Sequence, residues 1–195
     1  SFWLDASDFD IDARVRARLA HIGNAYADLD ALHDFGRLYS VLVDSRSPYT
    51  ATHSWGVAAV ANFLASYSGF DGAAAQQIDI VAQLHDIGKL VVPSRIIEKA
   101  GGLTAEEFGI IRGHAYFTGT LLASVPGLER IAEWARGHHE RLNGTGYPMG
   151  LAGVSVARET RVIAVADQFV ALTEDRPYRA GISGERAIQI LNESA

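Results

Sequence analysis

The fold of this chain is decided by residues 78–89, Ile-Asp-Ile-Val-Ala-Gln-Leu-His-Asp-Ile-Gly-Lys, where an apolar pattern ends on a His-Asp pair. Ile78, Val81 and Ala82 recur at the spacing of one helix face, and His85 continues that face. Helical periodicity dominates the rest of the sequence, and no convincing alternation of period two is present. We therefore predict an all-α helical bundle.

Turn-forming residues divide the helical pattern into segments. Thr104 and Glu107 have the spacing of a capping box, which predicts a helix start. Glycines predict breaks at 69–72 and 88–102 and a Gly-rich loop at 143–153. Complete helical segments are predicted at about 11–36, 50–67, 115–123, 127–139 and 156–173. A second segment follows the first as far as residue 43, another ends at residue 85, one begins at residue 104, and the last begins after residue 183.

Composition places the chain among ordinary globular proteins and limits its chemistry. It is 48% hydrophobic and 21% charged, which argues against disorder, and its longest apolar runs are too short to span a bilayer. The absence of cysteine excludes disulfides and thiolate ligands, so a metal would have to bind imidazole and carboxylate groups. The net charge of −6 argues against sequence-independent binding to DNA or RNA, although not against a small anionic substrate.

Histidine and aspartate residues on apolar helix faces form a second pattern, and we expect them to point into the core. They are His53, His85, Asp86, His114, His138, His139 and Asp167. A single such histidine is more often a hydrogen-bonded core residue, and a single aspartate often pairs with a buried arginine. Burying all of them for unrelated reasons would be costly, and metal ions resolve that cost. His21 and His33 lack this context and are interpreted as surface or packing residues.

The adjacent His85-Asp86 pair suggests how two metals would share these ligands. Neighbouring residues at a helix end diverge by about 100°, so the two side chains can reach different metals. We predict that Asp86 bridges the metals, with one metal held by His53, His85 and Asp167 and the other by His114, His138 and His139. Nitrogen and oxygen ligands suit iron or manganese, and zinc, nickel or cobalt could also bind.

Several motifs together resemble a known family. They are Ser47-Pro48-Tyr49-Thr50 before His53, His85-Asp86-Ile87-Gly88-Lys89, His114, His138-His139-Glu140-Arg141-Leu142-Asn143-Gly144-Thr145-Gly146-Tyr147-Pro148, Ala164-Val165-Ala166-Asp167 and Ala171-Leu172-Thr173-Glu174-Asp175-Arg176-Pro177-Tyr178-Arg179. In this order they resemble the HD-GYP branch of the HD phosphohydrolases over about residues 40–195. A His-Asp pair alone would be weak support, whereas the ordered set is highly specific.

The resemblance implies a helical bundle of the HD-domain type with a Gly-rich GYP loop. It also implies a phosphodiesterase that hydrolyses cyclic di-GMP to pGpG, in some members onward to GMP, with two or three metals, often iron or manganese. Three-metal members carry a Glu one helical turn before the first ligand His, where this chain has Tyr49. We therefore predict two divalent ions, iron or manganese.

Three cationic residues match substrate-binding positions of the family. Lys89, three residues after Asp86, is predicted to contact a phosphate oxygen during catalysis; the alternative is a surface lysine that caps a helix end. Arg176 and Arg179 match positions that contact the substrate phosphates, to which a guanidinium is well suited. The alternative for both arginines is a solvated or salt-bridged turn.

The Gly146-Tyr147-Pro148 loop is interpreted as a binding element. Its glycines permit positive φ or a close approach, and Pro148 stiffens the exit from the loop. In the family this loop shapes the region beside the site and has been linked to contacts with GGDEF domains; the alternative is a structural turn. The family usually has Asp where this chain has Asn143, which keeps the turn chemistry but loses a charge.

The predicted mechanism is attack by a hydroxide that bridges two metals on one phosphorus of cyclic di-GMP. Lys89 would stabilise the developing charge, while Arg176 and Arg179 hold the other phosphate. One alternative is an HD hydrolase of another nucleotide, such as cyclic GMP-AMP or a nucleoside phosphate, although the Gly-Tyr-Pro loop favours cyclic dinucleotides. Another is a non-catalytic module that binds a nucleotide or a GGDEF partner, against which the complete ligand set weighs.

The extent of the motifs predicts the domain organisation. Residues 1–39 are expected to form an N-terminal extended segment and helical linker, and residues 40–195 the HD-GYP-like catalytic domain. Because the chain begins without Met and stops abruptly after Ala195, we expect a fragment that is truncated at its C-terminus. No secretion signal opens the sequence, so we expect a cytoplasmic domain without membrane insertion, and its oligomeric state is left open.

Overall fold

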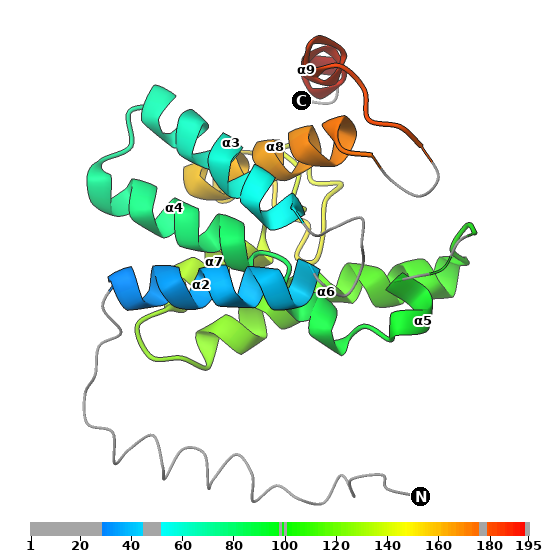
Figure 1. Cartoon of the computed structure of the whole chain (residues 1–195), viewed down its shortest axis with the longest axis horizontal. Coiled ribbons are helices and arrows are strands. Elements are labelled where there is room, and N and C mark those ends of the chain that lie inside the picture. The colour runs from blue at the N-terminus through cyan, green and yellow to red at the C-terminus, as the bar shows by residue number, and fades with distance from the viewer. Residues whose placement is uncertain (1–28, 45–51, 98, 100, 176–178, 194–195) are drawn as a thin grey trace, which may run out of the picture.

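The computed structural model describes residues 29–44, 52–97, 99, 101–175 and 179–193, and these residues form the predicted all-α bundle. The elements are α2 (Leu29–Asp44), α3 (His53–Tyr67), α4 (Gly72–Leu84), the 3₁₀ helix η1 (Ile87–Val91), α5 (Ser94–Ile97), α6 (Ala105–Ala123), α7 (Glu129–Arg136), the 3₁₀ helix η2 (Gly153–Ser155), α8 (Arg158–Thr173) and α9 (Gly184–Glu193). The described part contains no strand, and Asn143 and Ala152 form an isolated antiparallel bridge. In the view of Figure 1, α3 and α8 lie above α4, while α2, α6 and α7 lie below it.

Helix α4 lies at the centre of the core. It packs against α2, α3, α7 and α8, and its Ile78, Val81 and Leu84 side chains are buried. A helix that is surrounded on several sides needs apolar residues around most of its circumference, which explains the apolar run at 78–84. The carboxylate of Asp71 caps its N-terminus by accepting a hydrogen bond from Ala74 N at 2.8 Å. Because α4 is central, the residues that follow its C-terminus, His85 and Asp86, lie in the middle of the bundle.

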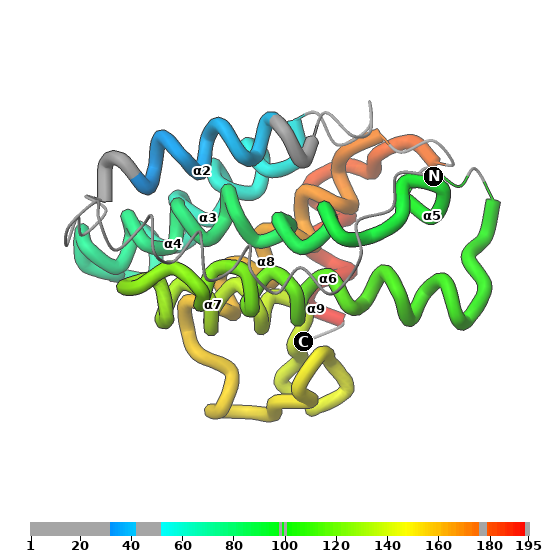
Figure 2. Tube along the Cα trace, turned by 90° about the horizontal axis from the view of Figure 1, so that it is seen from below, coloured from blue at the N-terminus to red at the C-terminus, as the bar shows by residue number. Residues whose placement is uncertain are grey.

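Several predicted boundaries are confirmed. The capping box at Thr104 is present, with both reciprocal hydrogen bonds to Glu107, and it opens α6. Helices α3, α8 and α9 agree closely with the predicted segments. The Gly-rich loop at 143–153 joins α7 to α8, and Figure 2 shows it in yellow, projecting from the body of the bundle.

Other boundaries were wrong. The predicted break after Gly36 does not occur, because α2 runs through this residue; a Cβ there would lie 3.2 Å from Gln83 Oε1, so the glycine permits close packing on α4. The segment 88–102, predicted as a break, contains η1 and α5, and α6 is one continuous helix from 105 to 123. Helix α7 ends at Arg136, three residues before the predicted end.

Parts of two predicted helices, 11–28 and 50–51, lie outside the described residues. The predicted domain boundary between residues 39 and 40 falls within α2 and stays a prediction.

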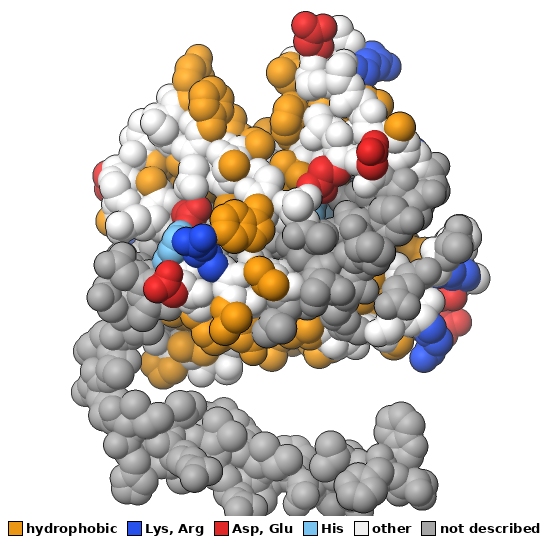
Figure 3. Space-filling view, viewed as in Figure 1, with side chains coloured by type: hydrophobic (Ala, Val, Ile, Leu, Met, Phe, Trp, Pro, Cys, Tyr) orange, Lys and Arg blue, Asp and Glu red, His pale blue; other side chains and the backbone are white. Residues whose placement is uncertain are grey.

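The outer face of α3 carries exposed aromatic side chains. Phe63 and Tyr67 are 68% and 84% exposed, and their ring centroids are 6.3 Å apart. Figure 3 shows hydrophobic side chains gathered over this part of the molecule. Apolar atoms make up much of any folded surface, so these rings alone identify no partner. Among the described helices, none combines the length and the apolar character needed to cross a membrane.

Candidate metal centre

The predicted ligands are supplied by different elements and meet inside the bundle. His53 is the first residue of α3, His114 lies within α6 and Asp167 lies within α8. The pairs His85-Asp86 and His138-His139 follow the C-termini of α4 and α7. All of these side chains are buried apart from half-buried His139, so the prediction that they point into the core is confirmed.

The ligand atoms form overlapping groups in which the atoms lie within 4.8 Å of one another. These groups are His114, His138 and His139; His53, His85 and Asp86; and His85, His138 and Asp167. The first group is the set predicted for one metal. The set predicted for the other metal is also close together, since Asp167 Oδ1 lies 3.1 Å from His53 Nε2 and 3.9 Å from His85 Nε2.

The carboxylate of Asp86 lies between the two sets. Its Oδ1 is 3.1 Å from His114 Nε2, and its Oδ2 is 3.3 Å from His85 Nε2. Burial opposes its ionisation, but the charge of Lys89, followed by the neighbouring imidazoles of His85 and His114, outweighs this and holds the pKa of the Asp86 carboxyl well below its usual range. An ionised carboxylate with one oxygen toward each set has the geometry expected of a bridging ligand.

The main chain fixes the orientation of three imidazoles. In each of them Nδ1 lies within hydrogen-bonding distance of the carbonyl oxygen three residues earlier. The pairs are His85 with Ala82 O at 2.7 Å, His114 with Ile111 O at 2.5 Å and His138 with Ala135 O at 2.6 Å. Because a carbonyl oxygen can only accept, Nδ1 donates and Nε2 is the nitrogen that faces the cluster. When the ring is neutral, this is the tautomer that a metal ligand requires.

The cluster contains buried acceptor atoms that no described donor satisfies. His85 Nε2 and Asp86 Oδ1 have no hydrogen-bond partner among the described residues. His114 Nε2 and His138 Nε2 lie 3.2 Å apart, and in two neutral rings whose Nδ1 atoms donate, both would carry lone pairs. Two nitrogens that bind one metal at about 2.0–2.1 Å are roughly 2.9–3.4 Å apart, so a shared cation fits this pair and removes the repulsion. The residues therefore fit a divalent metal centre.

Protonation differs between the two sides of the cluster. Burial lowers the pKa of His139 to about 4 despite nearby Asp167, and burial together with neighbouring imidazoles lowers the pKa of His138 well below its usual value. These rings are neutral at physiological pH, as ligands must be. Burial also opposes protonation of His53, but hydrogen bonds to Asp167 and Glu174 outweigh it and raise its pKa to about 9. A metal at His53 would therefore have to displace a proton.

The turn that carries His85 and Asp86 is clamped against α6. The Thr118 hydroxyl donates to His85 O and accepts from Gly88 N, both at 2.9 Å. A Cβ on Gly88 would lie only 2.0 Å from His114 O, so a larger residue does not fit at this position. Glycine at position 88 thus lets α6 bring His114 up to the His-Asp pair.

The predicted phosphate-binding residues lie in different environments. Lys89 is partly exposed, and its Nζ contacts Asp86 Oδ2, beside the cluster. The Arg179 guanidinium donates to the carbonyls of Ala171 and Leu172 near the C-terminus of α8 and to that of its neighbour Ala180. Arg176 lies outside the described residues. The substrate contacts of all three residues stay predictions.

The GYP loop packs directly on the cluster through Tyr147. The Tyr147 ring lies over the His139 ring with centroids 4.7 Å apart, and the Arg112 guanidinium lies 4.3 Å from the Tyr147 ring centroid. Burial, followed by the charges of Asp86 and Asp167, raises the pKa of Tyr147, so the phenol stays protonated. Arg112 thus places a positive charge near the half-buried side of the centre.

Glu140 organises the rest of the loop. Its buried carboxylate accepts hydrogen bonds from three main-chain N–H groups, those of Met149 at 2.7 Å, Gly150 at 3.2 Å and Leu151 at 2.9 Å. Gly146 packs against the backbone of Glu140, and a Cβ there would lie 2.5 Å from Glu140 Cα. Asn143 Oδ1 accepts from Thr145 N at 3.0 Å, so the turn chemistry expected of Asn143 is present.

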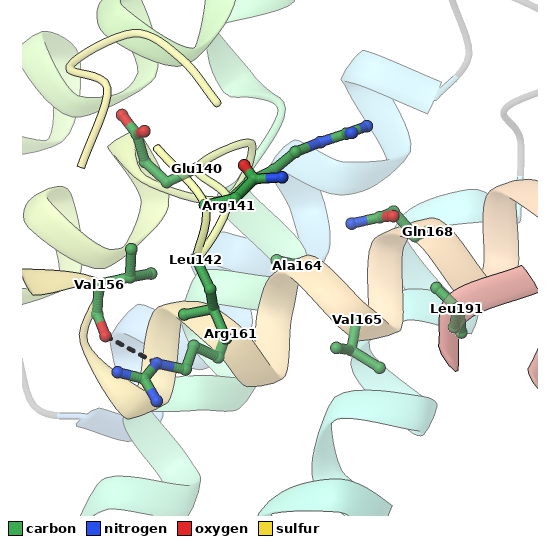
Figure 4. Close-up of a pocket in the computed structure, with 10 residues that line it drawn as sticks. Glu140, Arg141, Leu142, Val156, Arg161, Ala164, Val165, Gln168 and Leu191 are labelled. Atoms are coloured by element: carbon green, nitrogen blue, oxygen red, sulfur yellow. Dashed lines mark hydrogen bonds between the residues drawn. The ribbon is translucent and has the colours of Figure 1, made fainter. Parts of the chain in front are cut away.

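A pocket of about 130 Å³ lies on the other side of this loop, between it and helices α8 and α9 (Figure 4). Leu142, Val156, Val165 and Leu191 contribute apolar walls. Arg161, which also lines it, donates from Nε to Val156 O at 2.8 Å. None of the predicted metal ligands lines this pocket, so it is separate from the His/Asp cluster.

Sequence reasoning missed the roles of Glu140, Thr118, Arg112 and Glu174. Glu140 and Glu174 stand within the motifs, but a charged residue in a loop has no local feature that names its partner. The partner of Glu174 is His53, 121 residues away, with Oε2 at 3.1 Å from Nδ1. Only the packing of α3 on α8 brings these two residues together.

Comparisons with known proteins agree with this geometry. The family model described as HD domain matches residues 37–195. A 3'3'-cGAMP-specific phosphodiesterase of Vibrio cholerae is 38% identical over 156 residues, which is 80% of this chain and 34% of that protein. A cyclic di-GMP phosphodiesterase of Pseudomonas aeruginosa is 33% identical over 188 residues, which is 93% of this chain and 45% of that protein. The chain thus spans less than half the length of these relatives.

A solved structure shares the fold. The HDG"Y"P protein from Bdellovibrio bacteriovorus superposes with a TM-score of 0.60 at 17% sequence identity, covering 84% of this chain and 55% of that one. Together with the ordered motifs, these matches confirm the predicted resemblance, and the chain belongs to the HD domain family.

Proposed function

We propose that this chain is the catalytic domain of a metal-dependent phosphodiesterase that hydrolyses cyclic di-GMP to pGpG. The observation that carries the proposal is the cluster of five imidazoles and two carboxylates, whose ligand atoms form overlapping groups and include two buried atoms without a hydrogen-bond partner among the described residues. Relatives named cyclic di-GMP phosphodiesterases, such as those of Pseudomonas aeruginosa and Thermotoga maritima, support the choice of substrate. The proposed cofactors are two divalent ions, iron or manganese.

Two ions would be held by the sets already described, with Asp86 between them. When bound, they would polarise phosphoryl oxygens and lower the pKa of water, which supplies a nucleophile at neutral pH. The chain's own contribution is to hold the ligand atoms in place: main-chain carbonyls orient three of the rings, and Thr118 clamps the His85-Asp86 turn. The core beneath the cluster keeps bulk water from its buried side, which strengthens electrostatic interactions there.

Two cations border the cluster and would bind the anionic substrate. Lys89 Nζ lies next to Asp86 and would stabilise the negative charge that develops on phosphorus. Arg112 stands over Tyr147 at the half-buried side, where its guanidinium can pair with a second phosphate. Arg176 and Arg179 remain proposed phosphate ligands on family grounds. For Arg179 this requires its guanidinium to leave the carbonyls of α8 or to share its donors with the substrate.

A second candidate substrate is 3'3'-cGAMP. It is favoured by relatives of Vibrio cholerae named as 3'3'-cGAMP-specific phosphodiesterases, which are 38% and 36% identical to this chain. Both substrates are cyclic dinucleotides with two phosphodiesters, so the same metal centre would serve either, and the choice lies in contacts to one base. We also retain the cytoplasm as the proposed location, and a GGDEF-domain protein as the proposed partner of the GYP loop.

The test is a hydrolysis assay on protein of known metal content. Anaerobically purified protein is analysed for its metals, stripped with a chelator, and reloaded with Fe²⁺ or Mn²⁺. It is then incubated with cyclic di-GMP or 3'3'-cGAMP, and the products are separated by chromatography. We expect metal-dependent formation of pGpG from cyclic di-GMP, and more rapid turnover of 3'3'-cGAMP would replace our first substrate with the second.

Matched variants separate catalysis from folding. Asp86→Ala should abolish turnover, whereas His33→Ala, which changes a histidine paired with Asp79 outside the cluster, should retain it. Full activity of metal-replete Asp86→Ala would contradict the mechanism. Tight binding of nucleotide without any turnover in the metal-loaded wild type would identify a binding module instead of an enzyme.

A further inference from the structure

Glu174 is the first residue beyond α8, and it faces the start of α3. Its Oε2 lies 3.1 Å from His53 Nδ1, and its Oε1 accepts a hydrogen bond from the Thr52 hydroxyl at 3.4 Å. The main chain holds this residue in place, because Glu174 N donates to Val170 O at 2.9 Å in the last turn of α8. The carboxylate is therefore presented from a fixed backbone to the side of the His53 ring that points away from Asp167.

His53 differs from the other buried rings in how its Nδ1 is satisfied. His85, His114 and His138 each use the carbonyl oxygen three residues earlier. His53 opens its helix, so no preceding helical turn supplies such a carbonyl. Its Nδ1 faces the carboxylate of Glu174 instead. This histidine thus depends on a distant side chain for the hydrogen bond that its neighbours obtain locally.

A close approach of α3 to α8 makes this contact possible. Gly56, one turn into α3, faces Val170 and Glu174, and a Cβ there would lie 3.0 Å from Val170 Cγ1 and 3.7 Å from Glu174 Oε1. A side chain at position 56 would push the helices apart and lengthen the contact between Glu174 and His53. Gly56 and Glu174 are therefore both needed for the contact with the His53 ring.

We propose that Glu174 is a positioning residue for the metal centre, acting through His53. Its carboxylate accepts the Nδ1–H of His53, which fixes the ring orientation and keeps Nε2, the nitrogen that would bind a metal, directed toward Asp167 and the cluster. Carboxylates that hold a ligating histidine in this way raise the basicity of the ring, and their loss typically weakens metal binding about 10–100-fold. The inference rests on the proposed metal centre, and it adds a residue that touches neither metal nor substrate.

The experiment compares Glu174→Ala, Glu174→Gln and Glu133→Gln with the wild type. Affinity for Mn²⁺ is measured by competition with a chromogenic chelator, without reference to activity. Glu174→Ala should bind Mn²⁺ about 10–100-fold more weakly. Glu174→Gln should recover most of this loss, because its amide oxygen can accept the same hydrogen bond. Glu133 is exposed on α7, so removing its charge should leave the affinity unchanged.

A spectroscopic measurement separates positioning from a general effect on folding. Long-range ¹H–¹⁵N spectra of protein loaded with diamagnetic Zn²⁺ report the tautomer of each imidazole, and His53→Gln assigns the His53 signals. In the wild type His53 should carry its proton on Nδ1. In Glu174→Ala this signal should shift or broaden while those of His85, His114 and His138 stay in place.

The outcomes distinguish this inference from the proposed function. Wild-type protein that binds no divalent metal would overturn the metal centre itself. Wild-type protein that binds Mn²⁺, with both Glu174 variants binding equally tightly and with unchanged His53 signals, would overturn the role of Glu174 alone. If Glu174→Ala does not fold, the His53 signals of Glu174→Gln decide the question. Loss of the negative charge should weaken the hydrogen bond and shift the Nδ1–H signal, so an unchanged His53 signal in this variant would overturn the role of Glu174.

Discussion

His114 Nε2 and His138 Nε2 lie 3.2 Å apart in the core, and the Nδ1 atom of each ring donates a hydrogen bond to a main-chain carbonyl oxygen. When both rings are neutral, neither nitrogen can donate to the other, so two lone pairs would be in contact. A cation between the two nitrogens removes this repulsion. The main chain of α6 and the turn after α7 thus prepare the rings for an ion before any ion is bound.

Removal of one of these two imidazoles should therefore reduce the number of bound divalent ions by one. We expect His114→Ala to bind one divalent ion fewer than the wild type and to lose at least about 100-fold of its hydrolytic activity, because one member of a three-imidazole set is missing. Elemental analysis of the purified variant and a turnover assay measure the two effects. His33→Ala serves as the control, and an unchanged metal content in His114→Ala would contradict the predicted ligand set.

Metal uptake should depend on pH through His53. Its pKa of about 9 in the metal-free protein means that the ring holds a proton at neutral pH, which an ion must displace. The apparent affinity for Mn²⁺ should therefore rise as the pH increases toward 9, by up to about tenfold per pH unit for this one proton, and fall on acidification. Chelator competition at several pH values measures this slope, and calorimetry in buffers of different ionisation enthalpy counts the protons released. A flat profile between pH 6.5 and 8.5 would show that His53 is not protonated in the metal-free protein.

Glu140 should stabilise the GYP loop far more than an ordinary surface acid. Glu140→Ala removes a buried carboxylate and leaves three main-chain N–H groups without their acceptor, for which we expect about 2–4 kcal/mol of lost unfolding free energy. Denaturant unfolding measures the loss, and hydrogen exchange at residues 149–151 should accelerate. Glu133→Ala, a change of the same type at an exposed position, should shift the free energy of unfolding by less than about 0.5 kcal/mol. Equal effects of the two substitutions would argue against the anchoring role.

Arg112 should contribute to substrate binding more than to chemistry. Within the described residues its guanidinium contacts the rings of Phe108 and Tyr147 and has no acidic partner, so its charge is available to a phosphate. We expect Arg112→Gln to raise KM for the cyclic dinucleotide about tenfold with a smaller change in kcat. Arg130→Gln is the matched control, because Arg130 also stacks on an aromatic ring, that of Trp134, on α7. Steady-state kinetics that are alike in both variants would remove Arg112 from the binding site.

Substitution by alanine should destabilise the protein at Gly88 and stabilise it at Gly109. A Cβ on Gly88 would meet His114 O at 2.0 Å, so Gly88→Ala should force α6 away from the His85-Asp86 turn, destabilise the fold by several kcal/mol and weaken metal binding. Gly109 lies within α6 with nothing within 4 Å of its Cβ position, so Gly109→Ala should stabilise the protein by about 0.5–1 kcal/mol. Thermal unfolding and metal analysis of both variants test this pair. A tolerated Gly88→Ala with normal metal content would mean that the turn and α6 can separate without harm to the site.

Local signals in the sequence were sufficient wherever a residue's role follows from its own neighbours. The helical period placed His53, His85, His114 and Asp167 on buried faces, and the Thr104 capping box marked the start of α6. The same reasoning failed at Gly36 and at 88–102, because glycine was interpreted as a helix breaker. At Gly36 the structure uses glycine for close contact between helices, which depends on a partner that the local sequence does not name.

By itself, the sequence determined the helical class, the order of the ligand residues and the family to which the chain belongs, since periodicity and motif spacing are properties of neighbouring residues. The tertiary structure decided which side chains serve the ligands: that Glu174 holds His53, that Glu140 anchors the GYP loop, and that Arg112 stands over Tyr147. It also placed the oxygens of Asp86 toward the two ligand sets. These pairings join segments that are distant in the chain, and they form only when the helices have packed, because hydrogen bonds and ion pairs act over a few ångströms of space and not along the sequence.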